Sequence, residues 1–428
     1  MAHMTSSTED APRRRPRRVG SAPCLSIVHG LARGQTIVIG DRGTVVGCSA
    51  GTGGVVLGDP LASRIHFEVV PMEDRDLFLI RDLGSRNGTA VNGVRVSDKA
   101  LASGDVIRAG NTLLVYRKGA ARTSIPEFVQ RAAGSDVHVL ILKETGVGKE
   151  VVARGIHEAG CRRGPFVAVN CAAVPRDLLA SELFGHVRGA FSGAEHSRAG
   201  LFASARGGTA MLDEIGDMPL EQQPALLRVL ETRAVRRIGG DGDHPIDARI
   251  IAATNVDLRS LVTVGRFRGD LYARLAQLVA EIPLLRARRE EILPFAMELG
   301  EQIRPGFALD ADAAEALLLW NWPHNVRELK SLIGTLCLAP LRQGHVTLDD
   351  LSEHRPDIVA STPSSRRSVF PAEVRSSEVL SDRARLADAL MSVDGNFAAL
   401  ARTLGTSRTH VYRWIRKLKL DQPTPSDS

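Results

Sequence analysis

A series of short segments between residues 24 and 118 alternates apolar with polar positions, and most of these segments end at a glycine or at Asn-Gly. Alternation with a period of two places every second side chain on one face, as in a half-buried β-strand. Asn-Gly pairs and single glycines favour the tight turns that join antiparallel strands. The pattern therefore predicts an all-β sandwich over residues 24–118.

The pattern changes after residue 125. Near-continuous apolar runs at residues 138–142, 166–170, 208–214 and 248–255 alternate with helical segments. Buried strands that alternate with helices indicate a parallel α/β sheet. Residues 291–353 have a helical pattern throughout, and so do residues 381–420, apart from breaks near Gly395 and Gly405. The chain is therefore expected to be multidomain, with β, α/β and all-α parts in that order.

Composition narrows the class of protein. The 428 residues carry a formal net charge of +6, which is compatible with an acidic partner such as nucleic acid. No apolar run approaches the roughly 18 residues of a membrane helix, and no signal peptide is evident. The five cysteines form no CxxC pair, so neither a zinc site nor a disulfide framework is indicated. We expect a cytoplasmic protein without a membrane partner, with a disordered basic tail over residues 1–23 and a linker over residues 354–380.

A glycine-rich segment, KETGVGKE, follows the apolar run at 138–142 and precedes a helical pattern. Backbone N–H groups of such a loop cradle phosphates, and Lys149 would reach the terminal ones. Two positions depart from the usual loop, since Lys143 replaces the first glycine and Glu150 replaces Ser or Thr. The expected ATP-binding residues of this segment are Glu144, Thr145, Gly146, Val147, Gly148, Lys149 and Glu150.

Other polar positions follow the later apolar runs. Asp213 and Glu214 end one run, and adjacent carboxylates suit Mg²⁺ coordination and activation of an attacking water. Arg268 and Arg274 lie six residues apart, and in a ring ATPase they are candidates to enter the site of a neighbouring subunit. Arg327, on a helix after a proline, is available to sense nucleotide.

These motifs, in their order along the chain, resemble the AAA+ module of bacterial sigma-54-dependent transcription activators over residues 125–353, with a helical lid at about 291–353. The resemblance implies that Asp213 holds Mg²⁺, that Glu214 polarises water, and that Asn170 restrains Glu214. It assigns sensor roles to Thr254, Asn255 and Arg327. It also implies sigma-54 RNA polymerase as partner and a homo-oligomer, expected to be a hexamer built from dimers.

One aromatic residue stands in a frame of small residues in GAFSGA. This segment resembles the loop of the same family that touches the sigma factor, so Phe191 is expected to be exposed for a partner. Ser192 replaces the usual threonine of this loop and keeps the hydroxyl group. The loop consists of Gly189, Ala190, Phe191, Ser192, Gly193 and Ala194.

The predicted sandwich contains SRIH at 63–66 and NGT at 87–89, which resemble the signatures of a forkhead-associated (FHA) domain. Such domains bind phosphothreonine peptides. The resemblance implies that the ligand phosphate and peptide are bound by Ser63, Arg64, Arg86 and Asn87. Cys48 stands where the family has a binding arginine. A sandwich that docks on the ATPase without reading phosphate is the alternative.

Residues 394–420 resemble a Fis-type helix-turn-helix, and residues 381–420 carry a net charge of +5 from eight Lys/Arg and three acidic residues. A solvated basic helix is the simpler alternative. The expected contacts to enhancer DNA come from Ser407, Arg408, Thr409, His410 and Arg413.

Taken together, the sequence predicts an ATP-dependent transcription activator that requires ATP and Mg²⁺ and responds to a phosphothreonine-containing protein or a Ser/Thr kinase. Two alternatives stay open. One is a DNA-binding regulator whose ATPase has decayed at Lys143, and the other is a phosphopeptide adaptor that uses the ring as a scaffold.

Overall fold

The computed structural model describes residues 22–49, 54–72, 77–119, 125–341 and 344–362. The described residues divide into two compact units, one within residues 118–356 and the other within residues 24–117. Each unit is described by itself. None of the helices in the described ranges is long and apolar enough to cross a bilayer.

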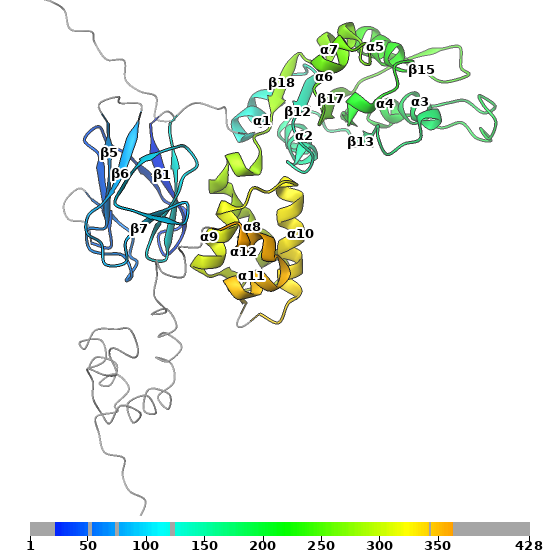
Figure 1. Cartoon of the computed structure of the whole chain (residues 1–428). Coiled ribbons are helices and arrows are strands. Elements are labelled where there is room, and N and C mark those ends of the chain that lie inside the picture. Colours follow the sequence, from blue (N-terminus) through cyan, green and yellow to red (C-terminus); the bar gives the residue numbers. More distant parts are fainter. Residues whose placement is uncertain (1–21, 50–53, 73–76, 120–124, 342–343, 363–428) are drawn as a thin grey trace, which may run out of the picture. The chain divides into compact units, whose positions relative to one another are not determined.

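Residues 24–117 form two packed β-sheets, as the period-two alternation predicts (Figure 1). The six-stranded sheet has the order β2 (Thr36–Val38), β1 (Cys24–His29), β11 (Thr112–Arg117), β10 (Val106–Ala109), β7 (Thr89–Val91), β8 (Val94–Val96). The five-stranded sheet has the order β4 (Val55–Val56), β3 (Thr44–Gly47), β5 (Phe67–Pro71), β6 (Phe78–Asp82), β9 (Asp98–Leu101).

One core joins the two sheets. Leu25, Ile27 and Tyr116 from the first sheet pack with Phe67 and Ile80 from the second, and all five are essentially buried. Burial of a large apolar side chain contributes about 1.5–3 kcal/mol each. The all-β prediction for this part of the chain is therefore confirmed.

The second unit contains a five-stranded sheet of the order β13 (Phe166–Asn170), β14 (Thr209–Asp213), β17 (Arg249–Thr254), β12 (Val139–Leu142), β18 (Leu278–Glu281). All its pairings are parallel. The predicted parallel α/β sheet is confirmed. Because the chain visits the strands out of spatial order, residues distant in sequence meet at the carboxyl ends of β12, β14 and β17.

Helices cover both faces of this sheet. On one face, α1 (Ile125–Ala133) and α2 (Lys149–Ala159) pack on Ile141 and Ile251. The opposite core contains Leu140 and Ala252, the neighbours of these residues along each strand, as expected when side chains alternate between faces. The elements on or beside this side are α3 (Arg176–Phe184), α4 (Leu201–Ser204), η2 (Ile215–Asp217), α5 (Gln223–Thr232), α6 (Leu258–Thr263) and α7 (Gly269–Leu275). A hairpin of β15 (Ala234–Arg236) and β16 (Asp243–Pro245) extends from α5.

A helical subdomain follows β18. It contains η3 (Leu285–Ala287), η4 (Arg289–Glu291), α8 (Ile292–Ile303), α9 (Ala311–Leu319), α10 (Asn325–Leu338) and α11 (Leu348–His354). The short strands β19 (Ala308–Leu309) and β20 (His345–Val346) pair in parallel. The prediction that residues 291–353 are helical throughout is therefore wrong at these two strands. The helix α12 (Pro356–Ala360) also lies inside the predicted linker, where Ile358 is buried.

Candidate functional site

The predicted phosphate loop connects β12 to α2. Gly146 and Gly148 have φ values of 82° and 99°, which a glycine adopts without strain. Lys143 has a φ of 138°, which is rare for a residue with a Cβ and costs about 1–3 kcal/mol. Its backbone N–H donates to the carbonyl of Thr254 at 3.3 Å, and its ammonium pairs with Glu281 at 3.3 Å. The loop therefore keeps the expected turn despite the missing first glycine.

A buried ion pair joins this loop to the end of β14. Lys149, the first residue of α2, donates from Nζ to Oε1 of Glu214 at 2.9 Å. Both side chains are nearly buried, with exposed fractions of 7% and 12%. The other carboxylate oxygen of Glu214 accepts from the backbone N–H of Asn255 at 3.0 Å. Glu214 is thus held between the phosphate loop and the end of β17.

Asp213 lies beside this pair with a different partner. Asn170, at the end of β13, donates from Nδ2 to Oδ2 of Asp213 at 3.3 Å. Among the described residues, Asn170 makes no hydrogen bond to Glu214, the contact that the family resemblance implies. Burial, followed by the negative charge of Glu214, raises the pKa of Asp213. Such crowded negative charge favours a cation at this position.

The predicted sensor residues lie at the same edge. Thr254 is fully buried, and its hydroxyl accepts from the backbone N–H of Val256 at 3.2 Å. Asn255 donates from Nδ2 to the hydroxyl of Thr145 in the phosphate loop at 3.1 Å. Glu150, in contrast, is exposed and pairs with Arg154 on α2 at 3.1 Å. The tertiary structure thus places the Asn255 amide in contact with the phosphate loop, whereas the Glu150 carboxylate points to Arg154 on α2.

The helical subdomain contacts the phosphate loop through residues that sequence reasoning did not single out. Asn325 is buried with a φ of 52° and donates from Nδ2 to the carbonyl of Thr145 at 3.2 Å. The amide oxygen of Asn325 accepts from the N–H of Leu285 at 3.0 Å. Arg288 is also buried, and it donates to the carbonyl of Val147 at 3.0 Å. The available signal for Asn325 in the sequence is its place two positions after Pro323, in WPHN, where a helix is expected to begin.

Arg327 follows on α10. The backbone N–H of Arg327 donates to the carbonyl of Gly146 at 3.3 Å. A Cβ built at Gly146 would lie 3.2 Å from the Cβ of Arg327. Its side chain is exposed. Glu144, at the start of the loop, is bound by Arg286 at 3.2 Å and by Asn325 at 3.4 Å. The subdomain is therefore attached to the loop that is expected to hold phosphate.

The two arginines proposed to act on a neighbouring subunit are both exposed, Arg268 as the N-cap of α7 and Arg274 within the helix. Arg268 precedes the helix and pairs with Asp270 through two nitrogens, at 2.7 and 3.0 Å. The charge of Arg274 acts on His138, which directly precedes β12 at the amino-terminal edge of the sheet. Burial, followed by the charges of Arg233 and Arg274, lowers the pKa of His138 to about 4. Neither arginine is paired with the carboxylates at the opposite edge of the sheet in its own chain.

The 189–194 loop lies between α3 and α4. Gly189 and Gly193 have φ values of 81° and 99°, and the N–H of Gly189 donates to the carbonyl of Ala194 at 2.8 Å. The ring of Phe191 is 39% exposed and packs edge-on against His186 with 5.0 Å between centroids. The aromatic side chain is therefore partly exposed at the tip of a closed glycine turn.

The base of this loop is attached to the β15–β16 region. The N–H of Val187 donates to the carbonyl of Ile238 at 3.1 Å, and a Cβ at Gly239 would lie 2.9 Å from the Cβ of Ala190. In Figure 1 the α3–α4 segment and the hairpin extend from the unit next to each other. Two loops from different parts of the chain therefore form one projection.

In the sandwich, the predicted phosphopeptide residues come from two loops that contact each other. The hydroxyl of Ser63 accepts from the N–H of Arg86 at 2.9 Å, and Asn87 donates from Nδ2 to the carbonyl of Leu61 at 2.8 Å. Arg64 and Arg86 are exposed. The fold thus brings together all four residues predicted to bind phosphopeptide.

His66 braces these loops from inside the sandwich. Its Nδ1 accepts from the N–H of Ser63 at 2.9 Å, and its Nε2 lies 3.2 Å from the carbonyl of Gly88, so the neutral tautomer with a proton on Nε2 satisfies both contacts. Burial lowers its pKa, which favours this neutral form. Cys48 is half-buried against the core, and its N–H donates to the carbonyl of Ser63 at 2.9 Å. Position 48 therefore offers no cation to a ligand.

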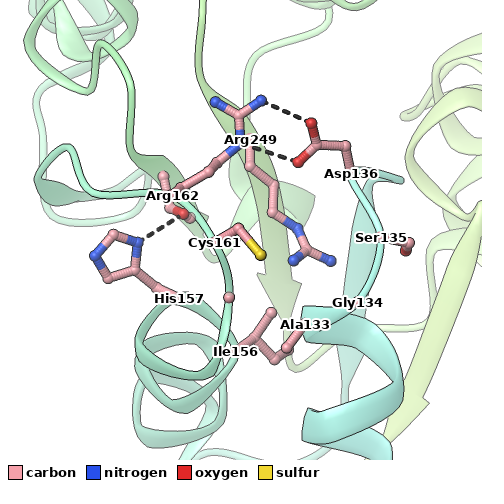
Figure 2. Close-up of a pocket in the computed structure, with 11 residues that line it drawn as sticks. Ala133, Gly134, Ser135, Asp136, Ile156, His157, Cys161, Arg162 and Arg249 are labelled. Carbon is pink, nitrogen blue, oxygen red and sulfur yellow. Dashed lines mark hydrogen bonds and ion pairs between the residues drawn. The ribbon is translucent and has the colours of Figure 1, made fainter.

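A cavity of about 450 Å³ lies elsewhere, beside the carboxyl ends of α1 and α2 (Figure 2). Arg162 pairs there with Asp136 at 2.9 Å and with Asp247 at 2.8 Å. Arg249, the first residue of β17, donates to the carbonyl of Ala132 in α1 at 2.8 Å. A cation is favourable at a helix carboxyl end. None of the predicted site residues lines this cavity, so we assign its arginines a structural role.

The predicted DNA-binding residues Ser407, Arg408, Thr409, His410 and Arg413 lie outside the described residues. The predicted helix-turn-helix over residues 381–420 therefore stays a prediction.

Comparison with protein families identifies three domains. Residues 115–281 match the Sigma-54 interaction domain, residues 286–368 match the AAA+ ATPase lid domain, and residues 44–110 match the FHA domain. The chain therefore carries a sigma-54 interaction domain with its lid, preceded by an FHA domain. These domain matches confirm the resemblance of the β-sandwich to an FHA domain and of the α/β unit with its helical subdomain to the sigma-54 activator module.

Related proteins align with much of the chain. The chain is 41% identical over 324 residues to a protein named limonene hydroxylase from Geobacillus stearothermophilus. The alignment covers 72% of this chain and 58% of that protein. The chain is also 41% identical over 280 residues to the DNA-binding transcriptional regulator NtrC of Azospirillum brasilense. That alignment covers 64% of this chain and 57% of NtrC. The chain thus spans little more than half the length of these relatives.

A solved structure extends the comparison. NtrX from Brucella abortus in complex with ADP is 29% identical, with a TM-score of 0.51 over 70% of each chain. The two chains are therefore similar in fold over the aligned length.

Proposed function

We propose that this protein uses ATP to activate transcription by sigma-54 RNA polymerase, from an oligomer that is bound to enhancer DNA through residues 381–420. One observation carries the proposal. The same unit that matches the Sigma-54 interaction domain gathers a buried lysine, two carboxylates and a strand-end amide at one edge of its sheet, and projects an aromatic side chain on a glycine turn.

The ion pair between Lys149 and Glu214 gives the site a way to respond to nucleotide. Arrival of the terminal phosphates offers Lys149 a stronger anionic partner than a single carboxylate. Glu214 is then released to accept a proton from an attacking water, while the N–H of Asn255 keeps its other oxygen in place. Hydrolysis and loss of phosphate restore the pair. Lys149 therefore acts on the phosphates, and Glu214 acts on water.

Asp213 is the residue of this site that fits Mg²⁺. Its raised pKa and its position beside Glu214 mark a place where a cation relieves repulsion between carboxylates. When bound, the ion neutralises charge on phosphate oxygens. Asn170 orients the carboxylate of Asp213 through their hydrogen bond.

Assembly of several chains supplies groups that one chain lacks. Arg268 at the start of α7 and Arg274 within it are exposed and are not paired with Asp213 or Glu214 of their own subunit. In a ring they therefore act on the phosphates of the next subunit. A hexamer built from dimers meets this requirement. Arg327 and Asn325 report the state of the phosphate loop to the helical subdomain.

The 189–194 loop is the part that acts on the polymerase. A partly exposed aromatic ring on a closed glycine turn has an apolar surface to offer a protein partner. Movement of this loop with the nucleotide state would push on the sigma factor and open promoter DNA. Control by the FHA domain, through a phosphothreonine-containing protein or a Ser/Thr kinase, completes the proposal.

A promoter-opening assay with sigma-54 polymerase, ATP and the full chain tests this function. Wild type is expected to open the promoter, whereas Phe191→Ala keeps ATP turnover and loses opening. Glu214→Gln is expected to bind ATP, with both turnover and opening lost. Opening by Phe191→Ala at the wild-type level would contradict the proposed role of the loop.

A non-catalytic DNA-binding regulator is the second candidate, and the strained φ of Lys143 in the phosphate loop is the observation that favours it. The two candidates differ in one measurement. ATP turnover no higher than that of Glu214→Gln, together with retained binding to DNA, would establish the second candidate and exclude the first.

A further inference from the structure

The FHA domain lacks a cation at position 48, yet a different arginine reaches its ligand loops. Arg95 lies on β8, opposite Ala90 of β7. A Cβ built at Gly88 would lie 2.0 Å from Nε of Arg95 and 2.4 Å from its Nη2. The guanidinium therefore occupies the space that any side chain at position 88 would need. Gly88 follows Asn87 directly, so the charge of Arg95 lies beside the residue predicted to grip the peptide.

This arginine is available to a ligand. Its side chain is exposed, and among the described residues no hydrogen bond or ion pair involves its guanidinium. Arg81 of β6 differs, because Glu68 neutralises it at 3.1 Å. Asp82, the acidic residue at the end of β6, is occupied by the hydroxyl groups of Ser85 and Thr89, at 2.5 and 2.6 Å.

We propose that Arg95 is a ligand-binding residue of the FHA domain, and that it supplies the cation that Cys48 cannot provide. This inference rests on the proposed reading of phosphothreonine by this domain. The ligand group is an anion of the bound peptide, either the phosphate or an acidic side chain close to it. Guanidinium donors bind both groups through charge-assisted hydrogen bonds.

The contacts of the two loops support this position. Ser63 reaches Arg86 through its hydroxyl, and Gly88, two residues further on, is held from inside by His66 and covered from outside by Arg95. A peptide that contacts Ser63 and Asn87 therefore passes near the guanidinium. Gly88 serves two purposes, because its φ of 75° suits glycine and its missing side chain makes room for Arg95.

The test is a titration of the full chain with synthetic peptides. The probe has the sequence of residues 5–12, TSSTEDAP, with phosphate on Thr8. A second peptide has Glu9→Gln and Asp10→Asn, and a third lacks the phosphate. The variants are Arg95→Gln, Arg95→Lys, and Arg81→Gln as a matched loss of one positive charge in the other sheet.

Arg95→Gln is expected to weaken binding of the phosphorylated probe about ten-fold or more, with Arg95→Lys intermediate and Arg81→Gln within about two-fold of wild type. A loss on both phosphorylated peptides assigns the phosphate as partner, and a loss only with Glu9 and Asp10 present assigns the acidic side chains. Melting temperatures equal to wild type show that the variants are folded.

Two failures are distinguishable. Equal affinity of wild type for the phosphorylated probe and the unphosphorylated peptide overturns phosphothreonine reading itself. In the other case, wild type binds the phosphorylated probe more tightly than the unphosphorylated peptide, and Arg95→Gln binds the phosphorylated probe as tightly as wild type does. This result overturns only the role of Arg95.

Discussion

The strain at Lys143 predicts that a glycine at this position stabilises the α/β unit relative to an alanine. The φ of 138° costs a residue with a Cβ about 1–3 kcal/mol, and glycine relieves this cost. Glycine also gives the unfolded chain more freedom, which removes about 0.4–1 kcal/mol of the gain. Lys143→Gly is therefore expected to be more stable than Lys143→Ala by about 1 kcal/mol.

The ion pair with Glu281 contributes separately. Its side chains are 42% and 64% exposed, so it stabilises by about 0–1 kcal/mol. Glu281→Gln removes the pair and leaves the backbone at position 143 unchanged, which makes it the matched control. This variant is expected to shift the free energy of unfolding by less than about 1 kcal/mol.

The measurement is thermal unfolding of the full chain, followed in the transition of the α/β unit. A change of 1 kcal/mol corresponds to about 2–4 °C for a unit of this size. Lys143→Gly should therefore melt about 2–4 °C above Lys143→Ala. Equal melting temperatures, or a higher one for alanine, would show that the backbone at this position is not strained and would refute the reasoning.

Three further predictions follow from the structure. The pKa of His138 is lowered to about 4 in the folded protein, below its value in the unfolded chain. The unfolded state therefore binds a proton more readily, and the free energy of unfolding falls as the pH drops from about 6.5 towards 4. His138→Gln should flatten this pH dependence in denaturant titrations. A Cβ at Gly47 would lie 2.1 Å from the carbonyl oxygen of Arg64, so Gly47→Ala should destabilise the sandwich by about 2 kcal/mol or more, whereas Gly40→Ala, with its nearest neighbour at 3.5 Å, should not; calorimetry of both variants checks this. Asn325→Ala leaves the buried N–H of Leu285 without its partner and removes a hydrogen bond to the carbonyl of Thr145. This variant should cost about 1–3 kcal/mol of stability and bind ATP more weakly in a nucleotide titration.

Local pattern was enough to predict the elements that surround the site. Period-two alternation indicated the sandwich, and apolar runs alternating with helices indicated the parallel sheet, because these periodicities reflect one face of each element. The glycine-rich loop was recognised for the same reason, since its neighbours along the chain are a strand and a helix. Lys149, Asp213 and Glu214 do meet at the carboxyl edge of the sheet, as their strand-end positions indicated.

Pairings between distant segments were not predictable in this way. Asn170 contacts Asp213 and not Glu214, because β13 lies directly beside β14 and the register places residue 170 opposite residue 213. The partner of Glu214 is Lys149, on the far side of β17 from β13. The strand order decides both contacts, and it differs from the order of the strands in the chain.

The amino-acid sequence by itself determined the types of element, their order along the chain, and which residues end the strands of the sheet. The tertiary structure alone decided which of those residues touch. It placed Asn325 and Arg288 on the carbonyls of the phosphate loop, and it placed Arg95 over the backbone of Gly88. The physical reason is that periodicity and turn chemistry act within a few residues, whereas these contacts depend on packing between segments whose relative positions no local pattern encodes.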